Sequence, residues 1–103
     1  MAIVKLTDEN FDSVVMSSEK TVLIDLYADW CGPCKMLSPI IESISEEHPE
    51  YLVCKVNVDN CPRIARRFRV MSIPMLVVMR DGDVLESAVG YRTKENILEM
   101  LGE

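Results

Sequence analysis

The strongest constraint on the fold is a nearly continuous run of β-prone apolar residues, Thr21-Val22-Leu23-Ile24-Asp25-Leu26-Tyr27. A run without alternating polar positions is typical of a strand that is covered on both faces, as in a parallel sheet with helices on either side. Asp25 is the one carboxylate inside the run. The run therefore predicts a central strand of an α/β fold with a single buried acid within it.

The rest of the chain supplies partners for that strand. Asp81-Gly82 suits a two-residue hairpin turn, and the order β-α-β-α-β-α-β-β-α predicts a central mixed sheet of about five strands flanked by four helices. We interpret residues 1–103 as a single domain. Further strands are predicted at Ile3–Leu6, Tyr51–Val58, Met75–Met79 and Val84–Val89, and helices after Thr7, from Cys31 to about Glu47, after Pro62, and from Thr93 through Leu101.

Charge and segment lengths exclude several classes of partner. The chain has 11 Lys+Arg against 17 Asp+Glu, a net charge of -6 that repels phosphate backbones and anionic lipids, so neither nucleic acid nor a membrane is expected as a partner. The longest apolar run, Met75–Met79, is far short of the ~20 residues that a bilayer requires. Met1–Asp8 has no export signal. We therefore expect a cytoplasmic protein whose four cysteines are reduced.

The motif Trp30-Cys31-Gly32-Pro33-Cys34 stands between the buried strand and the long helix. Backbone N–H groups at a helix N-terminus stabilise an anion, so Cys31 is the candidate nucleophile. Pro33 fits the first turn and Gly32 allows a tight entry, which brings Cys34 within disulfide distance. Cys31 would attack a substrate disulfide, and Cys34 would displace the bound thiol as the resolving cysteine, without a cofactor.

Asp25 and Lys55 are candidate accessory residues. Cys34 must lose a proton before it attacks, and burial should raise the pKa of Asp25 enough for this carboxyl to accept that proton, directly or through a water. Lys55, on the following strand, is the expected counter-charge. The alternative is a structural Asp25–Lys55 pair, and the nearby thiols favour proton transfer.

The segment Leu26-Tyr27-Ala28-Asp29-Trp30-Cys31-Gly32-Pro33-Cys34-Lys35 resembles the active-site segment of thioredoxins. The similarity covers nearly the whole chain. It includes Asp25, Pro39, Lys55-Val56-Asn57-Val58-Asp59, Ile73-Pro74 and Gly90. A family that matches in so many places is far better supported than it would be by an isolated C-x-x-C.

The resemblance carries several implications. It implies the thioredoxin fold, a cis bond before Pro74, and general protein-disulfide reductase activity with recharging by a thioredoxin reductase. A monomer is the default expectation for so small an acidic protein. Gly32 and Pro33 between the cysteines go with a strongly reducing couple. The substrate-docking surface around Cys31 would comprise Trp30, Gly32, Pro33, Ile73, Pro74 and Gly90. Two positions depart from the family pattern, with Tyr27 where Trp is frequent and Met75 where Thr is common.

Other functions fit the motif less well. A zinc site needs four ligands, and the chain has one histidine and no second C-x-x-C, so we expect no metal. An oxidase or isomerase on the same fold would be favoured by export, and a glutaredoxin-like role is weaker still. A binding module that clamps partners around Trp30 and Pro74 is the rival from another class, and Cys31→Ser, Cys34→Ser would separate it from a reductase.

The remaining cysteines and the histidine receive simpler interpretations. Cys54, inside a predicted strand, packs as a small hydrophobe and is too far from Cys61 for a disulfide if the strand continues to Asp59. Cys61 precedes Pro62 at a helix start, where a lowered pKa would allow glutathionylation or an intermolecular disulfide; the alternative is an inert helix-cap cysteine. His48 is interpreted as a solvated loop residue.

Overall fold

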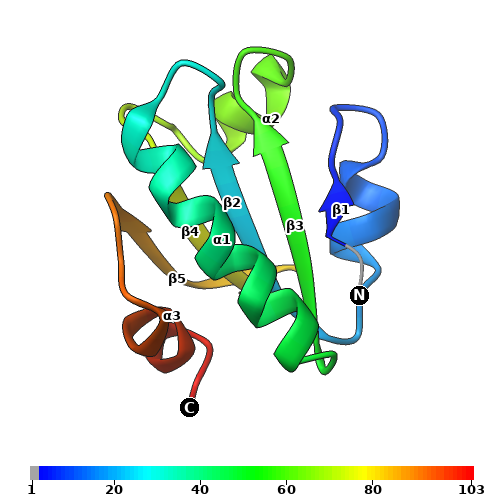
Figure 1. Ribbon diagram of the computed structural model, residues 1–103. Coiled ribbons are helices and arrows are strands. Elements are labelled where there is room, and N and C mark those ends of the chain that lie inside the picture. The colour runs from blue at the N-terminus through cyan, green and yellow to red at the C-terminus, as the bar shows by residue number, and fades with distance from the viewer. Residues whose placement is uncertain (1–2) are drawn as a thin grey trace.

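The computed structural model describes residues 3–103 and confirms the α/β architecture. Its five-stranded mixed sheet has the order β1-β3-β2-β4-β5, in which β1, β3 and β2 run parallel while β4 and β5 are antiparallel to their neighbours (Figure 1). The elements are β1 (Val4–Lys5), η1 (Asp12–Met16), β2 (Thr21–Tyr27), α1 (Gly32–Glu47), β3 (Tyr51–Asn57), α2 (Pro62–Arg67), β4 (Met75–Arg80), β5 (Asp83–Val89) and α3 (Lys94–Met100).

Strand β2 lies between β3 and β4 and is buried from Thr21 to Leu26, as its uninterrupted apolar run predicts. Successive side chains point to opposite faces of a sheet, so β2 contributes to two cores. Ile24 and Leu26 belong to one apolar cluster and Leu23 to the other. Asp25 alternates with Ile24 and Leu26 and therefore faces the same side as Leu23.

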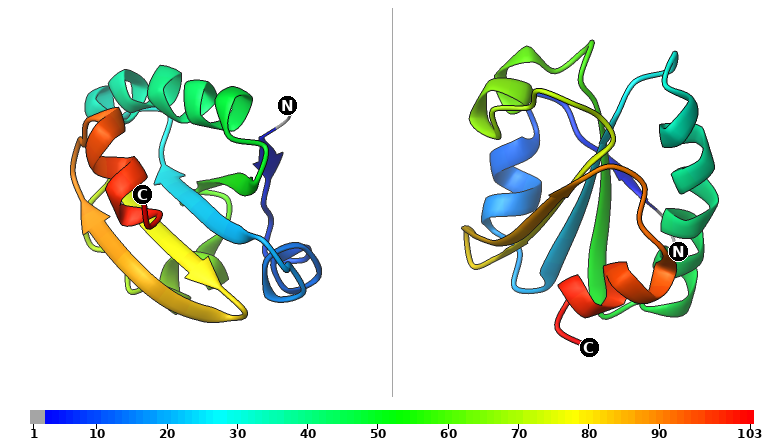
Figure 2. Two further views of the ribbon diagram at one scale, coloured as in Figure 1. Left: turned by 90° about the horizontal axis from the view of Figure 1, so that it is seen from below. Right: turned by 90° about the vertical axis from the view of Figure 1, so that its left-hand side faces the viewer.

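Helices cover both faces of the sheet, and they divide the core into two layers (Figure 2). Phe11 from the segment before η1 and Ile64 from α2 pack with Ile24 on one face. Leu37 from α1 and Ile97 from α3 pack with Leu23 on the other. Helix α1 therefore lies on the face to which Asp25 points, and its N-terminus lies beside the C-terminal end of β2 (Figure 1).

The first helical segment differs from the expected α-helix. Thr7 does cap a turn, because its hydroxyl accepts the N–H of Asn10 at 3.1 Å and the Asn10 amide oxygen accepts the N–H of Thr7 at 2.8 Å. The following helix, η1, is a π-helix with wider i→i+5 bonding. That spacing places residues four to five apart on one face, and Phe11 and Val15 are both buried.

The hairpin and its turn agree with the sequence pattern. Asp81 and Gly82 have φ angles of 53° and 83°, the left-handed conformation that a two-residue turn requires. The β4–β5 register shifts once, between Val78 and Met79. Within residues 3–103 the structure holds no helix that is long and apolar enough to cross a membrane.

Candidate active site

The two cysteines of the motif are joined as a disulfide at the N-terminus of α1. Their Cα atoms are 5.3 Å apart, and both residues are buried. Cys31 is the N-cap residue in an extended conformation, and its Sγ accepts the backbone N–H of Cys34 at 3.2 Å. A helix N-terminus carries unpaired N–H groups and the positive end of the dipole, so this contact favours negative charge on the Cys31 sulfur when the disulfide is reduced.

Gly32 and Pro33 form the exposed first turn between the cysteines. Pro33 fits there because the first turn has no acceptor for the N–H that proline lacks. The tight entry that we expected Gly32 to allow does not require glycine, since its φ is not in the left-handed region and an added Cβ would meet nothing within 4 Å. Local backbone geometry therefore does not explain why this residue is glycine.

Asp25 is a buried carboxyl that accepts no hydrogen bond from the part of the chain that the structure describes. The residue is 1% exposed, and within residues 3–103 neither carboxylate oxygen accepts a hydrogen bond. Burial raises its pKa to about 6, and the positive charge of Lys55 lowers it in part. A carboxyl with this pKa exchanges its proton near neutral pH, as a general acid or base must.

Lys55 lies beside Asp25 without pairing to it. The two residues are register partners on β2 and β3, yet no ion pair within 4.0 Å joins their side chains in the described chain. The Lys55 Nζ instead donates to the hydroxyl of Ser38 on α1 at 3.1 Å and lies 4.8 Å from the centre of the Tyr27 ring. Lys55 therefore acts on Asp25 as the expected counter-charge, but at a distance and not as a hydrogen-bonded partner.

A cavity of about 340 Å³ lies beside Cys34 and Lys55. The Cys34 side of the disulfide, Ser38 and Lys55 all border it. Its other lining residues are Tyr27, Ala28, Asp29 and Lys35. Cys34 therefore shares one cavity with the hydroxyl of Ser38 on α1 and the ammonium group of Lys55 on β3.

The residues expected to dock substrate divide into exposed and buried ones. Trp30 is 71% exposed, and its Nε1 donates to Asp59 at 3.0 Å. Ile73 is half-buried, and its carbonyl oxygen lies 3.9 Å from Cys31 Sγ. Pro74 follows a cis peptide bond, as the resemblance implies, but it is buried.

Gly90 supports this loop through its backbone. Its N–H donates to the Pro74 carbonyl at 2.8 Å. Its φ of +101° lies in the region that favours glycine, so a side chain here would strain the backbone even though an added Cβ meets nothing within 4 Å. The position therefore needs glycine for its conformation.

An open groove of about 520 Å³ borders Trp30 and Ile73. Its remaining lining residues are Val58, Ala65, Val70, Met71 and Ser72. Sequence reasoning missed Met71, which is 95% exposed. An apolar residue between the short helix and the Ile73-Pro74 pair was the signal that could have found it.

The other two cysteines are free and buried. Burial raises the pKa of Cys54 to about 12. Burial, followed by the charges of Asp8 and Glu9, also raises the pKa of Cys61, whose thiol donates to the Leu6 carbonyl at 3.5 Å. The hypothesis of a reactive, low-pKa Cys61 is therefore wrong, and the alternative of an inert cysteine agrees with the structure.

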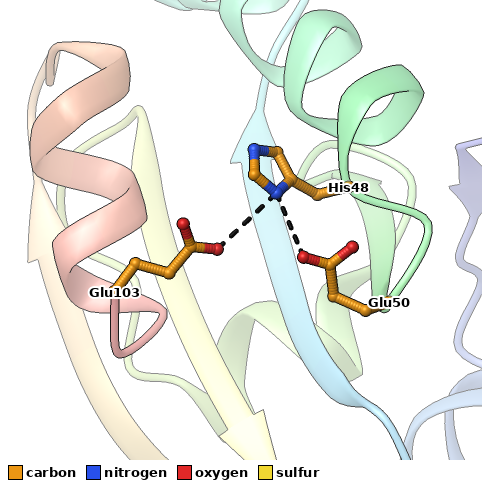
Figure 3. Close-up of side chains that lie close together, drawn as sticks. All are labelled: His48, Glu50 and Glu103. Carbon is orange, nitrogen blue, oxygen red and sulfur yellow. Dashed lines mark hydrogen bonds and ion pairs between the residues drawn. The ribbon is translucent and has the colours of Figure 1, made fainter.

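One further cluster, at the opposite end of α1, was not expected from the sequence. His48 Nδ1 lies 3.1 Å from Glu50 Oε2 and 3.6 Å from Glu103 Oε2. Figure 3 shows both carboxylates directed at the same ring nitrogen. Its ring stacks on Tyr51, so His48 is not the solvated loop residue we expected. The three ligand atoms lie within 4.8 Å of one another and could hold a metal ion, but the contacts are those of an imidazole paired with two carboxylates.

A five-stranded mixed sheet with a disulfide-forming cysteine pair at a helix N-terminus defines a dithiol–disulfide oxidoreductase. The thioredoxin family model matches residues 2–103. A thioredoxin of Staphylococcus haemolyticus is 45% identical over 102 residues, which cover 98% of this chain and 96% of that protein. A thioredoxin of Bacillus subtilis is 43% identical over 104 residues, with 100% and 98% covered. The chain belongs to the thioredoxin family.

Proposed function

We propose that the chain is a general protein-disulfide reductase in which Cys31 is the nucleophile. The observation that carries this role is the hydrogen bond from the Cys34 N–H to Cys31 Sγ, because it stabilises the thiolate needed for attack. The Cys31 thiolate displaces one substrate sulfur and forms a mixed disulfide. Cys34 then attacks Cys31, which releases the second substrate thiol and restores the Cys31–Cys34 disulfide. The substrate gains two electrons and the protein loses two, with no separate cofactor.

Asp25 takes the proton that Cys34 must lose. Support comes from its burial, its pKa of about 6, and the cavity that links Cys34 to Lys55. In this proposal the positive charge of Lys55 keeps part of Asp25 ionised before the step, as the carboxylate that can accept the proton. The proton transfer would pass directly or through a water.

Substrates dock on the groove beside Cys31. The exposed ring of Trp30 and the half-buried Ile73 border it, and the backbone of Pro74 and Gly90 supports the Ile73 loop. Gly32 and Pro33, which follow Cys31 in the chain, are both exposed and do not cover it with a bulky side chain. Because the groove is open and largely apolar, it suits extended protein segments of varied sequence better than one small molecule.

The chain acts, in this proposal, as a single-domain monomer in the cytoplasm. A thioredoxin reductase recharges it, and its substrates are protein disulfides. The net charge of -6 disfavours nucleic acid and anionic membranes as partners. We expect no metal in the catalytic cycle, because thiol–disulfide exchange proceeds between the sulfurs themselves.

An equilibrium redox titration in dithiol buffers tests this function. Trp30 is the sole tryptophan and adjoins the cysteines, so its fluorescence reports their oxidation state. We expect one two-electron transition at a strongly reducing potential in the wild type and none in Cys34→Ser. A markedly oxidising midpoint would instead indicate an oxidase or isomerase, and the absence of a transition would contradict the redox function.

A further inference from the structure

We propose that Ser38 is a positioning residue whose hydroxyl holds the Lys55 ammonium away from Asp25, and so leaves that buried carboxyl able to take a proton near neutral pH. This inference rests on the proposed role of Asp25 as the proton acceptor for Cys34. Ser38 touches neither the disulfide nor Asp25 in any hydrogen bond of the described chain. Its effect would reach the site only through Lys55.

The first observation concerns where the Lys55 side chain is held. Its Nζ donates to Ser38 Oγ at 3.1 Å and lies 4.8 Å from the centre of the Tyr27 ring. These two contacts come from α1 and from the end of β2, on either side of the cavity. A lysine side chain is flexible, and its ammonium group can reach several hydrogen-bond acceptors. The contacts with the Ser38 hydroxyl and the Tyr27 ring together hold this ammonium in one position.

The second observation concerns what Lys55 does not contact. Asp25 and Lys55 are register partners on adjacent parallel strands, an arrangement that lets their side chains extend from the same face of the sheet. Nevertheless, within residues 3–103 both Asp25 oxygens are buried without a hydrogen-bond partner. A buried ion pair would satisfy the carboxylate and hold it ionised. Lys55 is the register partner of Asp25 on the neighbouring strand and could form that ion pair, but its ammonium group is bonded to Ser38 instead.

The charges around Asp25 on every packed element leave Lys55 as the decisive one. Lys55 is the sole charge among the causes that set the pKa of Asp25, after burial. The strand on its other side, β4, presents Leu76 as its register partner. The other titratable groups nearby are Tyr27 and Asp29 on and after β2, Cys34 and Lys35 on α1, and Lys5, which pairs in register with Lys55 on β1.

Removing the Ser38 hydroxyl should therefore move Lys55 toward Asp25. In Ser38→Ala the ammonium loses the hydrogen-bond acceptor that it has in the described chain, and the Asp25 oxygens, which accept no hydrogen bond from residues 3–103, become the alternative. A closer positive charge favours the ionised carboxylate, so the Asp25 titration should move to lower pH. Alanine is the best helix former, so the variant should keep the fold of α1.

The test is a carbon-13 NMR titration of the Asp25 carboxyl in the oxidised protein, where Cys31 and Cys34 do not titrate. We expect the midpoint of the Asp25 titration in Ser38→Ala to fall by ~0.5 pH units or more, which is about a threefold change in the proton-binding constant. Ser38→Thr, which keeps the hydroxyl, should retain the wild-type midpoint. Ser43→Ala is the matched control, because Ser43 also accepts a lysine, Lys94, at 2.8 Å on the same helix but far from Asp25.

A second background shows whether the effect passes through Lys55. In Lys55→Met the Asp25 midpoint should rise, and adding Ser38→Ala should then change nothing. An unchanged or raised midpoint in Ser38→Ala, or a shift that persists without Lys55, would overturn the proposal. The pH profile of disulfide reduction separates the two hypotheses. If the NMR midpoint moves and the rate profile does not, Ser38 positions Lys55 as proposed, but Asp25 is not the proton acceptor.

Discussion

Two helices in this protein begin in the same way and differ in chemistry. Cys31 is the N-cap residue of α1 and Cys61 is the N-cap residue of α2, and each helix has a proline within its first two positions. Both cysteines are buried. At α1 the sulfur of Cys31 accepts a first-turn N–H, whereas the side chain of Cys61 caps nothing and its thiol donates to the Leu6 carbonyl.

The difference lies in what receives the free N–H groups of each helix. At α2 the carboxylate of Asp8 accepts the N–H groups of Arg63 at 3.2 Å and Ile64 at 3.0 Å. The positive end of that helix is thus already matched by a fixed negative charge, which disfavours a second one on Cys61. In this protein the sulfur of Cys31 faces the N–H groups of its helix, whereas at α2 a carboxylate takes that place.

Replacing a cysteine at each helix start with serine, Cys34 at α1 and Cys61 at α2, should give the largest contrast. Cys34→Ser removes the resolving thiol, so reduction of protein disulfides should stop at a mixed disulfide on Cys31 and turnover should be abolished. Cys61→Ser should keep wild-type turnover to within about twofold, because this buried thiol takes no part in exchange. Steady-state reduction of a disulfide protein, with mass spectrometry of the trapped adduct, measures both. Loss of turnover in Cys61→Ser would refute the contrast.

The site at the start of α1 also differs from α2 in its effect on stability, because the buried carboxyl of Asp25 lies on the strand that leads into it. The pKa of Asp25 rises from 3.8 to about 6 on folding. Between these values the folded protein holds a proton that the unfolded chain has released, so the free energy of unfolding falls as pH rises and stays reduced above the window. Relative to wild type, Asp25→Asn should gain about 3 kcal/mol on passing from below to above the window.

Urea unfolding at a series of pH values measures this gain. The exposed carboxyl of Asp29 provides the control, and Asp29→Asn should follow the wild-type pH dependence. A stability difference between Asp25→Asn and wild type that is independent of pH would contradict the proposed burial cost. The same variant should slow disulfide reduction by about a hundredfold if Asp25 accepts the Cys34 proton.

Much of the fold could be predicted from local patterns. The uninterrupted run at β2 fixed a two-sided strand, and Asp81-Gly82 fixed the hairpin, because each signal depends on a few adjacent residues. The disulfide between Cys31 and Cys34 could also be predicted from adjacent residues. Its spacing within one helical turn leaves the two sulfurs little choice of partner.

What could not be predicted depends on contacts between distant segments. Asp8 reads as a first-turn acid of its own helix, yet it caps a helix 55 residues further along the chain. Cys61 reads as activated for the same reason as Cys31, until the Leu6 carbonyl and Asp8 are placed beside it. Lys55 reads as a partner of Asp25, because nothing in a sequence says that Ser38 will accept its ammonium group.

Alkylation rates test the contrast between the two helix starts directly. In the reduced protein at neutral pH, iodoacetamide should modify Cys31 at least about tenfold faster than Cys61, since each unit of thiol pKa changes the thiolate fraction about tenfold. Peptide mass spectrometry assigns the modified residue. Cys54, whose pKa burial raises to about 12, is the internal control and should remain unmodified. Modification of Cys61 before Cys31 would reverse the conclusion.

The smallest expected effect comes from the carboxylate that distinguishes α2. Asp8→Asn keeps a side-chain oxygen that can accept an N–H, but it removes the negative charge that raises the pKa of Cys61. The variant should lose about 1 kcal/mol of unfolding free energy through the weaker cap. It should also let a disulfide reagent reach Cys61 a few times faster, because the thiolate is less disfavoured. Asp12→Asn, which removes an exposed acid four residues further along the chain, should change neither quantity. If Cys61 reacts with the disulfide reagent at the same rate in Asp8→Asn as in the wild type, burial alone makes this thiol unreactive. The two helix starts would then differ only in the solvent access of their cysteines.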